Sequence, residues 1–150
     1  MKRLPIFLIA FTLLFFYPLT LISAQTFDFN RAYQDYLYNF NLYRTSYQNY
    51  LSAKNEYQAY KTLNAETKAI QTTRQMFQNR DETLRTYLTA LRMKLGETTN
   101  IINYQQNLEY LKLDTETTWL ASHKETLAQA NSLADLLLIS SQLEQKYPAI

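Results

Sequence analysis

The sequence lacks cysteine entirely and contains one glycine and three prolines among its 150 residues. Without cysteine there is no disulfide, no thiol nucleophile and no cysteine for lipid attachment, so stability has to come from packing or from assembly. Sheets joined by tight turns need glycine and proline, and no segment alternates apolar and polar residues as a half-buried strand does. The sequence therefore predicts an all-α protein.

Residues 25–150 also lack an excess of charge of either sign. Lys2 and Arg3 are the only charged residues of the N-terminal segment 1–24, and beyond it thirteen basic residues balance thirteen acidic ones. No cluster of lysine and arginine remains. We therefore expect no nucleic-acid partner.

Residues 1–24 have the features of an export signal. Lys2 and Arg3 precede an apolar core over residues 7–17, and the small residue Ala24 stands where a signal peptidase would cut. The alternative is an uncleaved anchor, because the nineteen residues 4–22 approach the length of a membrane-spanning helix.

Both alternatives export the rest of the chain, residues 25–150. A cleaved protein would be secreted, periplasmic or part of the cell envelope. An uncleaved protein would be a single-pass membrane protein with these residues outside, and we expect contact with a membrane only in that case.

Eight aromatic residues follow one another along the first predicted helix. Their spacing mostly alternates between four and three residues, which is typical of a long α-helix that offers one seam to a partner helix. Around them, residues 25–60 are rich in Asn, Gln, Ser and Ala, and we call this segment the Tyr-rich arm. We expect it to contact a second copy of the chain or another helical protein. This aromatic stripe consists of Phe29, Tyr33, Tyr36, Phe40, Tyr43, Tyr47, Tyr50 and Tyr57.

No glycine or proline interrupts the helical pattern over residues 29–95, which predicts a long, coiled-coil-like N-terminal helix. The phase of the apolar seam changes at Tyr57, and such a change can mark a bend or a change of partner. Two shorter helices, over about 104–129 and 132–147, are expected to fold back on the leucine-rich half of the long helix, the second one starting with Ser132 as its cap and Asp135 three residues later. Residues 61–150 would form this antiparallel bundle, and the Tyr-rich arm would have no partner within the chain.

Few residues are candidates for chemistry. His123 is the only histidine and follows Trp119 by four residues, so we expect the two rings to pack at a helix contact rather than to provide a general base. Asp114 and Glu116 point to different sides of a helix and cannot share a metal ion. The sequence predicts no catalytic residue, no cofactor and no metal, and hence no enzyme.

Arg74 and Asp81 interrupt the apolar seam of the long helix one heptad apart. At a buried seam they could fix register or oligomeric state. In the alternative assignment both charged residues face water, and the seam consists of Ile70, Thr73, Phe77, Arg80 and Leu84. The sequence favours this alternative.

The export-like segment followed by helical periodicity resembles exported or membrane-tethered bacterial coiled-coil proteins. The resemblance assigns no functional residue. We expect an exported, non-enzymatic helical protein that acts in assembly or protein–protein interaction. Two alternatives remain: a membrane-anchored envelope scaffold, and contact with cell-wall material or glycan through the aromatic stripe.

Overall fold

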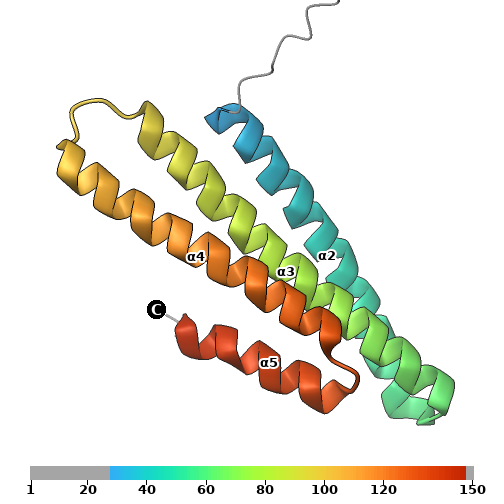
Figure 1. Ribbon diagram of the computed structural model, residues 1–150. Coiled ribbons are helices and arrows are strands. Elements are labelled where there is room, and N and C mark those ends of the chain that lie inside the picture. Colours follow the sequence, from blue (N-terminus) through green and yellow to red (C-terminus); the bar gives the residue numbers. More distant parts are fainter. Residues whose placement is uncertain (1–27, 148–150) are drawn as a thin grey trace, which may run out of the picture.

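The structure, a computed structural model, describes residues 28–147, and the expected export segment lies outside the described residues. Within them the chain forms four α-helices and no strand (Figure 1). The all-α prediction is therefore confirmed for this part of the chain. The helices are α2 (Phe29–Tyr60), α3 (Leu63–Glu97), α4 (Asn103–Gln129) and α5 (Leu133–Lys146).

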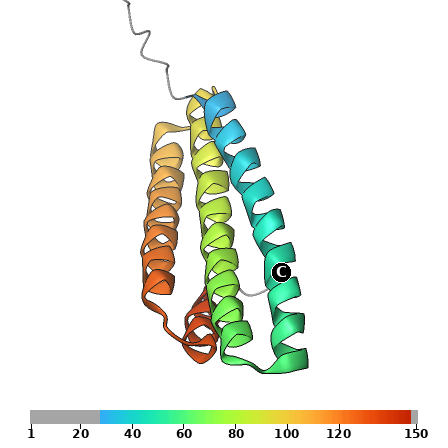
Figure 2. The same cartoon turned by 90° about the vertical axis from the view of Figure 1, so that its right-hand side faces the viewer.

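Helix α3 is the centre of the fold. Helices α2, α3 and α4 run antiparallel in one layer with α3 in the middle, and the short α5 turns back from the end of α4 (Figure 2). α2, α4 and α5 all pack against α3, and α4 also packs against α5. The bundle that was predicted for the second half of the chain is present, and it includes α2 as well.

The predicted long N-terminal helix is broken between Tyr60 and Leu63. Lys61 takes a left-handed conformation with φ 48° and ends α2, and the Thr62 side chain accepts a hydrogen bond from the N–H of Ala65 at 3.2 Å to cap α3. The expectation that the Tyr-rich arm lacks a partner within the chain is wrong, because α2 folds back along α3. The break follows the phase change at Tyr57 by four residues.

Small side chains form the contact between α2 and α3. The buried residues of α2 are Ala32, Ser46 and Ala53, which are multiples of seven residues apart. On α3, Thr83 is buried and its hydroxyl donates a hydrogen bond across the pair to the carbonyl oxygen of Asn39 at 3.0 Å. Small residues at a helix contact bring the two axes close together. Larger side chains of α2 are thereby left beside the contact.

The other side of α3 packs through larger side chains. Leu120 and Leu127 of α4 and Leu136 of α5 have exposed fractions of 1%, 0% and 0%. Ser132 and Asp135 form the reciprocal cap that was predicted at the start of α5, with hydrogen bonds of 3.1 Å in each direction. None of the helices within residues 28–147 has the length and apolar character needed to cross a bilayer.

Candidate functional site

The aromatic stripe lies beside the small-residue contact of α2, not on it. Tyr33, Phe40 and Tyr47 have exposed fractions of 41%, 38% and 40%, whereas the other members of the stripe are half-buried. Ring centroids of neighbouring members between Phe29 and Phe40 and between Tyr43 and Tyr50 lie 5.7–6.2 Å apart. The structure thus keeps most of the predicted interface residues together as one row of rings.

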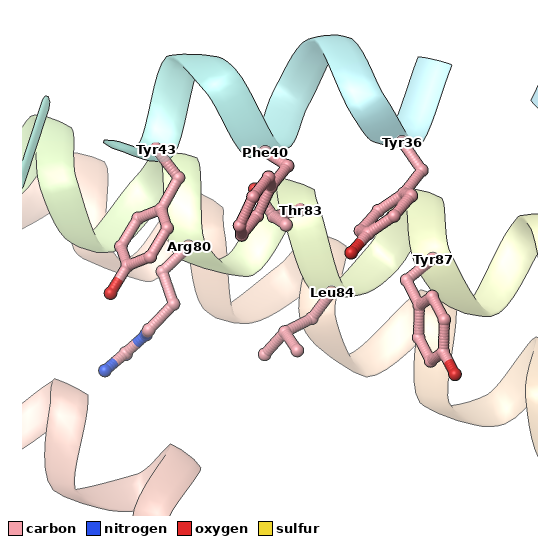
Figure 3. Close-up of a pocket in the computed structure, with 7 residues that line it drawn as sticks. All are labelled: Tyr36, Phe40, Tyr43, Arg80, Thr83, Leu84 and Tyr87. Carbon is pink, nitrogen blue, oxygen red and sulfur yellow. The ribbon is translucent and has the colours of Figure 1, made fainter. Parts of the chain in front are cut away.

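A groove of about 270 Å³ lies between some of these rings and helix α3. Figure 3 shows the α2 rings extending alongside α3, and the rings of Tyr36 and Tyr87 have centroids 5.4 Å apart. Most of the lining is apolar, with one charged side chain, Arg80. The groove is lined by Tyr36, Phe40 and Tyr43 of α2 and by Arg80, Thr83, Leu84 and Tyr87 of α3.

A second hollow of about 340 Å³ adjoins the first, because Leu84 and Tyr87 line both. It extends the apolar face from α2 across α3 to α5. The remaining residues that line it are Leu88 of α3, Leu120 of α4, and Leu143, Glu144 and Tyr147 at the end of α5. Sequence patterns did not predict this face, because it combines side chains from four helices.

A buried polar cluster joins the three helices α3, α4 and α5. His123 Nδ1 lies 2.5 Å from Asp81 Oδ2, and His123 Nε2 lies 2.8 Å from the carbonyl oxygen of Ile139. The exposed fractions of His123 and Asp81 are 3% and 0%. Arg80 adds a contact to Asp81 Oδ1 at 3.4 Å and donates to the Ser140 hydroxyl at 3.1 Å.

The favoured prediction that Arg74 and Asp81 face water is wrong. Asp81 is fully buried, and Arg74 is half-buried and donates a hydrogen bond of 2.5 Å to the carbonyl oxygen of Ala130. The reason is that α3 has neighbours on several sides. Residues of both alternative seams are therefore covered, including Phe77.

Hydrogen-bond roles fix where the hydrogens of this cluster lie. The carbonyl oxygen of Ile139 can only accept, so Nε2 of His123 carries a hydrogen. A second hydrogen must lie between Nδ1 and the Asp81 carboxyl group, since two acceptors do not approach to 2.5 Å without one. Burial raises the pKa of Asp81 above its ordinary value of 3.8, although the bond to His123 opposes this rise.

The predicted contact between His123 and Trp119 is confirmed, with stacked rings whose centroids are 4.8 Å apart. The sequence did not reveal the orienting carboxylate, which lies 42 residues away on another helix. Both ring nitrogens of His123 are engaged inside the protein, and the nearby Ser140 hydroxyl accepts from Arg80. This arrangement connects helices and leaves no ring nitrogen to take a proton from a ligand.

The two acidic residues that the sequence excluded as joint metal ligands have separate partners. Asp114 binds Arg92 with a shortest distance of 2.6 Å, and Glu116 binds Lys146 at 3.1 Å. Over residues 28–147 no group of three His, Asp or Glu side chains is placed to hold a metal ion. Comparison of the chain with protein-family models, with curated proteins and with solved structures found no match.

Proposed function

We propose that this protein is an exported, non-enzymatic helical protein that acts in assembly or protein–protein interaction outside the cytoplasm. Its aromatic stripe is the interface. The observation that carries this proposal is the exposure of Tyr33, Phe40 and Tyr47, which recur every seven residues and are each about two-fifths exposed. Phe40 also lines the apolar groove.

The chemistry of this surface suits a helical protein partner. Aromatic side chains are enriched at the centres of interfaces, where charged residues are depleted. Between Tyr36 and Ala53 the only charged residue is Arg44. A partner helix lying between α2 and α5 would cover the two adjoining hollows and present its apolar side to the rings. A second copy of the chain and a different helical protein both meet this description.

The interface is tested with a triple variant, in which Tyr33, Phe40 and Tyr47 are replaced by serine. We expect a lower oligomer mass by light scattering, with unchanged helix content by circular dichroism. The matched control replaces Tyr38, Tyr60 and Tyr104, which are 64%, 72% and 71% exposed and lie outside the stripe. An equal loss of mass in both variants, or in neither, would contradict the proposal.

Export is supported by the character of residues 1–24, and intact mass distinguishes its two forms. A mature protein that begins at Gln25 indicates a cleaved signal, whereas a retained segment makes the protein a membrane-anchored scaffold. The aromatic interface is compatible with either form.

Glycan contact is a second candidate, favoured by a shallow hollow on the exposed side of α2. Its lining combines two tyrosine rings with amide and hydroxyl groups that could bind sugar hydroxyls: Asn41, Tyr43, Arg44, Thr45, Tyr47 and Gln48. Calorimetric titration with cell-wall glycan fragments tests it. Binding that is abolished by Tyr47→Ser and kept in Tyr38→Ser would favour a glycan over a protein partner.

A further inference from the structure

We propose that one proton held between His123 and Asp81 latches helix α5 to the α3–α4 pair, and that loss of this proton at alkaline pH undocks α5. The latch is inferred without use of the proposed partner interface, although α5 lines the second hollow. It rests on the hydrogen-bond geometry of two side chains and one backbone carbonyl group from three different helices.

Helix α5 depends on its contacts for its position. It has 14 residues, near the length at which an isolated helix is only marginally stable in water. Leu136 and Leu143 are its buried apolar anchors. Its polar anchors near the middle are the Ile139 carbonyl oxygen, which faces His123, and the Ser140 hydroxyl, which accepts from Arg80.

Counting hydrogens shows why the docked geometry needs the extra proton. With two hydrogens in the pair, both the Asp81 contact and the Ile139 contact are satisfied. With one hydrogen left on the ring, either Nδ1 faces the Asp81 carboxylate as a second acceptor, or Nε2 faces the Ile139 carbonyl oxygen as a second acceptor. Each tautomer thus leaves one repulsive contact in a buried site, where an unsatisfied acceptor is costly. Movement of α5 away from His123 relieves the contact at Ile139.

The charged and titratable groups around the pair do not supply a substitute proton. On α3, Arg80 contacts Asp81 Oδ1 and Glu82 is bound to Arg85 and Lys124. On α4 and α5, Glu116 is bound to Lys146 and to the Tyr147 hydroxyl, and Glu144 lines the second hollow. α2 contributes no charged side chain to the groove beside Arg80.

Undocking would change the surface next to the aromatic groove. α5 supplies Leu143, Glu144 and Tyr147 to the second hollow, and its departure would expose Leu120 and Leu127. Once α5 has left, water can donate to Nε2 of His123 while Nδ1 donates to Asp81, so at alkaline pH the undocked form binds one proton fewer than the docked form. The docking equilibrium constant should then fall by about tenfold per pH unit.

The test is a set of urea titrations of the full chain between about pH 6 and 9.5, followed by methyl NMR. Ile139 reports on α5 and Ile70 reports on α3. We expect the Ile139 signal of docked α5 to be lost at a lower urea concentration than the native Ile70 signal. The docking constant of α5 should fall tenfold per pH unit. A docking constant for Ile139 that does not change with pH would overturn the latch, as would loss of both signals together at every pH.

Asp81→Asn tests whether the pH dependence of α5 docking comes from the proton shared with His123. The new amide can donate to Nδ1 while Nε2 donates to Ile139, so this variant should dock without any dependence on alkaline pH. Glu116→Gln makes the same chemical change near the end of α5 and should keep the tenfold slope. A slope in Asp81→Asn equal to that of the unmodified protein would overturn the proposal. If Asp81→Asn does not fold, the pH dependence of the unmodified protein decides.

Discussion

The two sides of helix α3 are packed with different kinds of side chain. Against α2 the buried partners are small, such as Ala32, Ser46 and Ala53, and the aromatic rings lie beside the contact. Against α4 and α5 the buried partners are leucines together with an Asp–His pair. The leucine side uses its large side chains for the core, whereas the α2 side leaves part of its aromatic surface exposed.

Leu127→Ala should have the largest effect on stability, because the side chain is 0% exposed in the core formed with Met76 and Phe77. We expect a loss of about 2–5 kcal/mol in the free energy of unfolding, measured by urea denaturation. Leu138→Ala on α5, where the side chain is 69% exposed, is the matched control and should change it by less than about 0.5 kcal/mol. Similar losses for the two variants would contradict a leucine core on this side.

Ala53→Leu tests the close contact on the opposite side. Ala53 is 0% exposed between α2 and α3, so the added atoms should force the helices apart and cost about 1–3 kcal/mol. Ala59→Leu, on the exposed surface of the same helix, should have little effect. If both variants were equally stable, the small residues would not determine the distance between the helices.

Two neighbouring carboxylates should respond to pH with opposite signs. Burial raises the pKa of Asp81, and the folded Asp81–His123 pair as a whole holds one proton that the unfolded chain keeps on its imidazole only up to about pH 6.5, so stability should fall as the pH rises above about that value, by up to about 1.4 kcal/mol per unit. The hydrogen bond from Arg85 lowers the pKa of Glu82, so its contribution is present above about pH 4.5 and is lost as the pH falls through the lowered value. Urea denaturation at a series of pH values checks both signs in Asp81→Asn and Glu82→Gln. Asp81→Asn should abolish only the fall in stability at high pH, and Glu82→Gln should abolish only the fall at low pH.

Tyr33→Ser should have the smallest effect on folding. Because 41% of this side chain is exposed, we expect the free energy of unfolding to change by less than about 1 kcal/mol. Assembly should nevertheless weaken, which sedimentation measurements would show. A large loss of stability without any change in assembly would make the ring an ordinary part of the core.

Much of the fold could be predicted from local patterns. The scarcity of glycine and proline indicated helices, and Ser132 with Asp135 marked the start of α5 because a cap depends on residues a few positions apart. The break at Lys61 was not recognised, since a left-handed lysine carries no sequence signal comparable to a glycine. A phase change at Tyr57 was the available hint.

The candidate sites were harder to predict because they depend on contacts between distant segments. The rings of the aromatic stripe drew attention away from Ala32, Ser46 and Ala53, whose spacing is the signal of the actual helix contact. Asp81 stood out in the sequence as a charged residue within an apolar seam. Its pairing with His123 follows from the packing of α4 on α3, which no local pattern gives.

The most direct test of the proposed aromatic interface is the solution mass of residues 25–150, measured by light scattering over a range of concentrations with and without serine at Tyr33, Phe40 and Tyr47. We expect the unmodified chain to form a dimer or a higher oligomer, alone or with a helical protein that elutes with it, and the variant to be a folded monomer. An unmodified chain that is monomeric and binds nothing, with a variant that behaves identically, would contradict the role of the stripe as an interface.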